Sequence, residues 1–271
     1  MSVRRCRMKT RIVTITDCAD VASNEIHASL VTTLDKLNVD DKVVVEPIVH
    51  CQEFSLLHCA FLTRLLADSY SADSTVFLVI ANALPTSRAE RARIVGRTEE
   101  GYRFAGENTG AFSWLFKDFG VAEVYEASRK GLDGQEFVPF GGKYFHAPNA
   151  ALVASGKKLS TFGSVFSPQK LATLNIPMGS IVHIDNFGVV KIKAEMPALN
   201  EGEVMQVFLN EEYLFNAVFT HSMKNLPDNT QALYRGSSFN LIELGCVRNI
   251  QTNKQLFKIG NIISFRKEHE Q

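Results

Sequence analysis

Strand-like and helix-like segments alternate over the first 80 residues of this chain. Residues 11–16 alternate β-branched and polar positions as a strand does, and residues 24–37 carry apolar side chains at helical spacing. A second strand is predicted over residues 42–49 and a second helix over residues 53–70. Residues 76–80 are uniformly apolar, as in a strand that is buried on both faces. This order predicts an α/β domain with a mixed sheet and flanking helices.

The pattern changes near residue 165. Short strands separated by turn residues are predicted further on, over residues 181–193, 203–209, 212–220 and 240–248. We therefore expect an α/β domain over residues 1–165 and a smaller all-β, barrel-like domain over residues 175–271. A chain of 271 residues is long enough for two such unequal domains.

The charge balance restricts the partners of this protein. The chain has 29 Lys and Arg residues and 29 Asp and Glu residues, so its formal net charge is zero. Broad surfaces for nucleic acid or anionic membranes need excess positive charge, so we expect neither partner. No apolar run approaches the roughly 20 residues of a membrane helix. We expect a cytoplasmic protein whose basic stretch 1–11 is a tail rather than a targeting sequence.

The cysteine and histidine spacings predict no metal site. The number of cysteines is odd, and no Cys-x-x-Cys, His-x-x-x-His or comparable ligand spacing occurs. We expect reduced thiols, no bound metal and no cofactor. The cysteines are Cys6, Cys18, Cys51, Cys59 and Cys246.

Two polar residues follow predicted strands of the α/β domain. Asp17 ends the first strand, and Asn82 follows the apolar strand, so both should open onto the carboxyl edge of the sheet, where such folds bind ligands. Asp17 either accepts hydrogen bonds from a ribose diol or only forms a turn. The loop after Asn82 carries Arg88, Arg91 and Arg93, which either hold an anion or form a solvated face.

Three further places carry candidate binding residues. Asn24 is a possible cap of the helix 24–37 and a candidate substrate contact. Phe140 precedes a pair of glycines, which either let the backbone approach a ligand or simply make a turn. At the start of the second domain, Asp185 and Phe187 either hold an ammonium group and stack on a base or form an ordinary hairpin turn.

Seven short motifs occur in one order along the chain. They are Thr16-Asp17, Val49-His50 with residues 59–70, residues 74–80, residues 108–110 with 124–126, residues 140–148, residues 184–188, and Ser237-Ser238 with residues 241–243. In this order and spacing they resemble the motifs of the S-adenosyl-L-methionine (SAM) hydroxide adenosyltransferases, a family that includes the fluorinases and chlorinases. The resemblance runs over nearly the whole chain.

The resemblance implies an α/β domain, a β-barrel-like domain and a homotrimer, with SAM between the large domain of one subunit and the small domain of the next. It implies in-line attack of a nucleophile on the 5′ carbon of SAM, with methionine leaving. It places Asp17 on the ribose diol, Asp185 on the methionine ammonium and Ser238 near the methionine end. Phe187 would form part of the adenine pocket. Phe140, the first residue of the motif 140–148, is a candidate substrate contact.

The departures from the family pattern fall where the chemistry is expected. Hydroxide-using members carry an Asp, an Arg and a His that position and activate water. Asn82 stands at the Asp and Gly141 at the His, while the arginine falls at or beside Ala89, with Arg88 near it. An amide cannot act as a base, and glycine has no acceptor side chain. Asn82 and Arg88 are therefore the catalytic candidates, since Asn82 can still orient a water by hydrogen bonding.

Three hypotheses follow. The first is an enzyme that cleaves SAM with water or another small nucleophile. The second is a homologue that binds SAM or adenosine without turnover. The third is a trimeric protein whose ligand has changed. In the first two, SAM is the substrate or ligand, and no further cofactor is expected.

Overall fold

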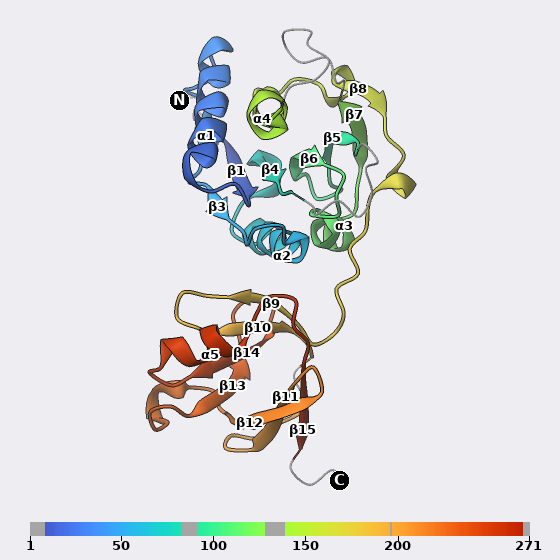
Figure 1. Ribbon diagram of the computed structural model, residues 1–271. Helices are drawn as coiled ribbons and strands as arrows, with labels where there is room; N and C mark the ends of the chain where they lie inside the picture. Colours follow the sequence, from blue (N-terminus) through green and yellow to red (C-terminus); the bar gives the residue numbers. More distant parts are fainter. Residues whose placement is uncertain (1–8, 83–90, 128–138, 196, 268–271) are drawn as a thin grey trace, which may run out of the picture. The chain divides into compact units, whose positions relative to one another are not determined.

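The computed structural model describes residues 9–82, 91–127, 139–195 and 197–267. The chain divides into two compact units, Met1–Leu174 and Asn175–Gln271 (Figure 1). Each unit has its own sheet and its own hydrophobic core. Among the described residues, no helix has both the length and the apolar character needed to cross a bilayer.

An eight-stranded mixed sheet forms the first unit. Its strands are β1 (Thr10–Thr16), β2 (Val43–Val45), β3 (Val49–His50), β4 (Thr75–Ile80), β5 (Arg93–Arg97), β6 (Arg103–Glu107), β7 (Glu123–Ala127) and β8 (Gly163–Val165). The strand order is β2-β1-β4-β6-β5-β7-β8, and β3 pairs with β1. Strands β1, β2, β3, β4 and β6 run parallel, whereas β5 is antiparallel to both β6 and β7.

Helices cover both faces of this sheet (Figure 1). They are α1 (Asp20–Lys36), α2 (Leu56–Ala67), α3 (Ser113–Phe119) and α4 (Ala147–Ala154). Strand β4 shows why both faces need cover. Its residues Val76, Leu78 and Ile80 belong to the core built with α1 and α4, and Phe77 packs on the other side against Tyr102, with ring centroids 5.7 Å apart. The predicted α/β fold with a mixed sheet is confirmed.

Two helices begin at other residues than expected. Helix α1 starts one turn early, because the side chain of Asp20 accepts the N–H of Ala22 at 2.9 Å and so satisfies the first turn. Asn24 therefore lies inside the helix with its side chain exposed, and its predicted capping role is wrong. Helix α2 starts after Ser55, whose hydroxyl accepts the N–H of His58. Phe54 falls within the helix predicted over residues 53–70, but it lies before α2 and is 51% exposed.

Two expectations about regular structure also change. The strand expected over residues 42–49 is split into β2 and β3, with Pro47, which has no N–H to donate, between them. Residues 131–148 are rich in glycine and aromatic residues, which predicts irregular structure, and residues 131–138 lie outside the described part of the chain. Its remainder contains a π-helical turn, η2 (Gly142–His146), which continues into α4. Short 3₁₀ turns are Ala72–Ser74, Leu159–Thr161, Pro168–Lys170 and Met223–Asn225.

A seven-stranded curled sheet forms the second unit. Its elements are β9 (Ser180–Ile184), β10 (Val190–Lys193), β11 (Val204–Leu209), β12 (Glu212–Phe219), β13 (Gln231–Arg235), β14 (Ile242–Cys246), the helix α5 (Ile250–Leu256) and β15 (Ile263–Lys267). The order is β15-β11-β12-β13-β14-β10-β9. The two ends approach each other, because the N–H of Ile181 donates to the carbonyl of Asn261 and the N–H of Ile263 to that of Gly179. The expected all-β, barrel-like fold is confirmed.

Candidate functional site

A pocket of about 180 Å³ lies at the carboxyl edge of the first sheet. Residues that follow β1, end β4 and end β6 line it together with the turn into η2. These residues are Cys18, Val79, Ile80, Ala81, Asn82, Glu107, Thr109, Phe140, Gly141, Gly142 and His146. This is the edge at which open α/β sheets bind ligands. Its volume is below the roughly 300 Å³ at which pockets for whole drug-sized ligands begin, so this pocket accommodates part of such a ligand.

Asp17 lies behind this pocket, at the end of β1, and is only 7% exposed. Its carboxylate accepts the main-chain N–H of Asn82 at 2.9 Å, the side-chain amide of Asn82 at 3.3 Å and the N–H of Phe54 at 3.2 Å. Asp17 therefore ties the loop after β4 to the segment before α2, as a turn-forming residue does. Its contact with a ribose diol stays a prediction.

Asn82 and Phe140 line the pocket, as a binding role requires. Asn82 is exposed, and its position is set by the bonds to Asp17. Phe140 has a φ of 66°, as Phe54 has one of 56°. Left-handed backbone at bulky residues is uncommon and clusters at functional sites, which fits the place of Phe140 in this pocket. Arg88 lies outside the described residues, and Asn24, exposed on α1, does not line the pocket.

Glu107 and His146 meet in the pocket, and sequence reasoning missed both. Oε1 of Glu107 lies 3.9 Å from Nε2 of His146, and Oε2 of Glu107 lies 4.0 Å from a guanidinium nitrogen of Arg91. His146 is only 5% exposed. Its imidazole contributes most to lowering the pKa of Glu107 against the opposing effect of burial, and Arg91 and Arg93 lower it further. The available signal was a glutamate at the end of a parallel strand.

The arginines that the sequence grouped have definite contacts where they are described. Arg91 pairs with Glu107, and the guanidinium of Arg93 lies 4.1 Å from the ring centroid of Phe145, the residue before His146. Such stacking on an aromatic face is favourable for arginine. These two arginines therefore contact Glu107 and the residue next to His146, and so hold positive charge beside this part of the pocket.

The glycine pair forms one wall of the pocket. Gly141 has ordinary right-handed helical angles, φ −53° and ψ −28°. A Cβ atom built on it would lie 3.8 Å from Nε2 of His146, which is ordinary contact distance. At the buried Gly142 a Cβ would lie 3.2 Å from Ile80. The backbone at Gly142 thus lies close to Ile80, whereas Gly141 has room for a Cβ beside the His146 ring.

The thiols near the pocket are packed rather than activated. Burial is the main cause that raises the pKa of Cys18, which lines the pocket. The pKa of Cys59 is raised well above its usual value, chiefly by a hydrogen bond with Cys51 and then by burial. Since the thiolate is the reactive form, these shifts disfavour a nucleophilic role. Within the described ranges, no cluster of three or more His, Cys, Asp or Glu side chains is arranged to hold a metal ion.

In the second unit, Asp185 shapes the turn after β9. One of its carboxylate oxygens accepts the N–H groups of Phe187 at 2.8 Å and of Val189 at 2.9 Å. Phe187 projects from this turn with 65% exposure. This is the geometry of a hairpin turn, and it leaves the Phe187 ring available for stacking. The ammonium and adenine roles stay predictions.

Ser238, in the loop between β13 and β14, is 7% exposed. The two residues that follow it, Phe239 and Asn240, have φ values of 54° and 55°, and Leu241 closes the turn on the carbonyl of Ser238. A tight turn with two left-handed residues fixes the position of Ser238. Its contact with the methionine end of a ligand stays a prediction.

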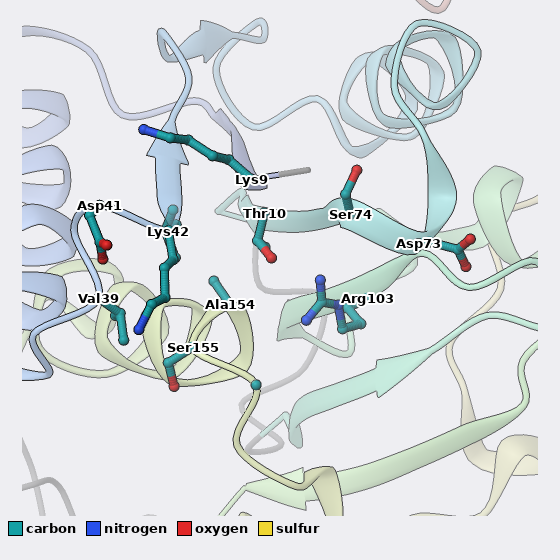
Figure 2. A pocket seen from close by; sticks show the side chains of 12 residues that line it. Lys9, Thr10, Val39, Asp41, Lys42, Asp73, Ser74, Arg103, Ala154 and Ser155 are labelled. Carbon is teal, nitrogen blue, oxygen red and sulfur yellow. The ribbon is translucent and has the colours of Figure 1, made fainter. Parts of the chain in front are cut away.

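A larger cavity of about 530 Å³ lies at the opposite edge of the first sheet, where β1, β2 and β6 begin (Figure 2). Lys9, Lys42 and Arg103 line it together with Asp41 and Asp73, so its charges are mixed. Arg103 donates to the carbonyl of Val153 at the end of α4, as a helix-capping residue does. This edge is not the one at which such sheets bind ligands, so the smaller pocket is the better candidate.

Comparison with known proteins gives a match to one family, one relative that is similar in sequence, and two solved structures that are similar in fold. The family described as "SAM hydroxide adenosyltransferase N-terminal domain" matches residues 12–163. An (R)-S-adenosyl-L-methionine hydrolase of Methanocaldococcus jannaschii is 26% identical over 184 residues, which cover 65% of this chain. The chain spans 64% of the length of that relative.

Two solved structures resemble this one in fold. An uncharacterized conserved protein from Thermotoga maritima matches with a TM-score of 0.76 and 19% identity, covering 94% of this chain and 100% of that one. A conserved hypothetical protein from Thermus thermophilus matches with a TM-score of 0.70 and 17% identity, covering 96% of this chain and 100% of that one. At these identities the likeness shows the fold alone.

Proposed function

The chain belongs to the SAM hydroxide adenosyltransferase family, which the match over residues 12–163 shows, and from this we propose that it cleaves SAM at the 5′ carbon. The products are adenosine and methionine when water is the nucleophile. The hydrolase name of the archaeal relative supports this reaction class.

The observation that carries this proposal is the pocket at the carboxyl edge of the first sheet. Asn82 lines it and is held in place by two hydrogen bonds to Asp17. An exposed amide in a fixed position can orient a small nucleophile without acting as a base. Such positioning supplies a large share of the rate of a displacement.

The proposed step is an in-line displacement. A lone pair of the water oxygen forms the new C5′–O bond, while the C5′–S bond breaks and its electron pair leaves with the sulfur of methionine. The positive charge of the sulfonium is thereby neutralised, and the water loses one proton. Asp17 would hold the ribose diol, Phe140 the nucleoside side of the pocket, and Asp185 and Phe187 the ammonium and the adenine. Arg88 remains the proposed second catalytic residue.

A second candidate is a homologue that binds SAM or adenosine without turnover. Asn82 favours it, because an amide cannot take a proton from water. The family resemblance also places Gly141 where a histidine is expected. A changed ligand is the third candidate.

The deciding experiment combines binding with product analysis. Calorimetric titration with SAM and with adenosine measures binding, and chromatography of the incubated SAM mixture measures turnover. Adenosine and methionine in equal amounts support the hydrolase. Binding without products, with and without added halide, supports the binding homologue. A protein that binds neither compound supports the changed ligand.

We also propose a homotrimer and a cytoplasmic location. The family resemblance alone supports the trimer, and sedimentation equilibrium tests it. The odd number of cysteines, which we expect to be reduced thiols, supports the location.

A further inference from the structure

We infer that His146 and Glu107 form the proton-accepting pair of this site. His146 takes the proton that the attacking water releases, and Glu107 is the positioning carboxylate that stabilises the charged imidazole. The inference rests on the proposed function, because it concerns the same displacement of methionine from SAM.

The reaction leaves one proton to be placed. Water must lose it as the C5′–O bond forms, and the neutral amide of Asn82 cannot accept it. Among the described residues that line the pocket, the side chains that can act as a base are those of Glu107, His146 and Cys18. Burial raises the pKa of Cys18, so its reactive thiolate is disfavoured. The histidine and the glutamate remain.

The geometry of the pair suits this role. Nε2 of His146 and Oε1 of Glu107 are 3.9 Å apart, too far for a direct hydrogen bond but close enough for both to contact one water molecule. The imidazole is 5% exposed and is fixed at the end of η2, next to the first turn of α4. A base held in this way loses little entropy when it meets its proton donor.

Glu107 supplies a negative charge beside the imidazole. The lowered pKa keeps Glu107 ionised, so its carboxylate lies beside any imidazolium that forms. Among the described residues, the other charged or titratable groups that face the pair are Arg91 and Arg93, which offset part of the negative charge of Glu107 from the β5 side, and Cys18 after β1. The carboxylate faces Nε2, the nitrogen that takes the proton, so it stabilises the imidazolium through its charge.

The imidazole of His146 lies beside Gly141, the position at which the family resemblance expects a histidine. A Cβ at Gly141 would lie 3.8 Å from both Nε2 and Cδ2 of His146, so the ring lies against the space that a side chain at position 141 would enter. Nε2 of His146 therefore places a basic nitrogen beside Gly141, which has no side chain that could act as a base.

The step balances with the pair in place. The O–H bond of water breaks as the C5′–O bond forms, the C5′–S pair leaves with methionine, and the proton moves to Nε2 of His146. The proton is released to solvent after adenosine and methionine leave. No oxidant, reductant or further reactant is needed.

The test is steady-state SAM cleavage by the full-length protein and its variants across pH 5 to 9, with SAM affinity measured by calorimetry. We expect His146→Gln to lower kcat by about 100-fold or more, the usual contribution of a general base, with little change in SAM affinity. We expect Glu107→Gln to lower kcat by about tenfold with little change in SAM affinity, since the imidazolium that forms in the reaction then lacks the carboxylate beside it.

Two matched variants serve as controls. His27→Gln removes a half-buried histidine on α1 that does not line the pocket. Glu123→Gln removes a carboxylate that pairs with Arg97 at 3.3 Å between β7 and β5, as Glu107 pairs with Arg91. Both should keep the wild-type rate profile.

The outcomes separate the two claims. Wild-type cleavage together with the losses above supports the pair. Wild-type cleavage that His146→Gln retains at every pH overturns the pair and leaves the proposed function standing. A wild-type protein that binds SAM and never releases adenosine overturns the proposed function and this assignment with it. If the buried His146→Gln variant does not fold, Glu107→Gln, with its 39% exposed side chain, decides by the same criteria.

Discussion

The carboxylate of Asp17 accepts both the main-chain and the side-chain N–H groups of Asn82, although 65 residues separate the two in sequence. The same carboxylate accepts the N–H of Phe54. One side chain at the end of β1 thus sets the positions of two segments beside the pocket. Any test of Asp17 as a ligand contact must therefore separate binding from this structural role.

Asp17→Ala should abolish adenosine and SAM binding and lower the free energy of unfolding by about 1–3 kcal/mol, because the partly buried hydrogen bonds from Asn82 and Phe54 to a charged acceptor are lost. Urea unfolding and calorimetry measure the two effects. Asn82→Ala is the control, since it keeps the main-chain bond to Asp17 at 2.9 Å and removes only the amide bond. Unchanged adenosine affinity in Asp17→Ala would discard the ribose assignment.

Glu107→Gln should destabilise the fold at pH 7 and not in acid. His146, chiefly, and then the two arginines lower the pKa of Glu107 from its ordinary 4.5. Such a carboxylate stabilises the fold above its unfolded pKa, and this contribution is lost as the pH falls through its lowered folded value. The difference in Tm from wild type should therefore shrink below pH 4.5. A difference that stays constant in acid would assign it to packing instead of charge.

The two adjacent glycines should respond oppositely to alanine. Gly141→Ala meets only the His146 ring at 3.8 Å in a helical backbone, so it should be neutral or stabilise by about 0.4–1 kcal/mol through the unfolded state. Gly142→Ala would place a Cβ 3.2 Å from Ile80 and 3.3 Å from Phe140, and should cost about 1–3 kcal/mol. Urea unfolding of both variants checks this. Equal destabilisation would contradict the close approach at Gly142.

Asp185→Asn should weaken SAM binding more than adenosine binding. The amide keeps an oxygen that can accept the N–H groups of Phe187 and Val189, so the turn survives while the negative charge is removed. Asp185→Ala removes both and serves as the comparison. Calorimetry with the two ligands gives the ratio. Equal losses for SAM and adenosine with Asp185→Asn would argue against pairing with the methionine ammonium.

The element types and the ligand-binding edge could be predicted from local patterns. The uninterrupted apolar run of β4 requires cover on both faces, and Asp17 and Asn82 had to follow parallel strands and so reach one edge of the sheet. The helix boundaries were less secure. Asp20, in place of Asn24, satisfies the first turn of α1, and nothing in the hydrophobic spacing distinguishes the two.

The sequence by itself determined the α/β and β-barrel-like classes, because hydrophobic periodicity reflects which faces of each element are buried. Only the tertiary structure decided that Glu107 lies beside His146 and that the carboxylate of Asp17 is occupied by Asn82 and Phe54. These contacts depend on the strand order β1-β4-β6 and on the π-helical turn η2. The turn could not be predicted, because its glycines and aromatic residues show no helical spacing. Side chains far apart in sequence meet through the packing of whole elements, and no local sequence pattern specifies which of them come into contact.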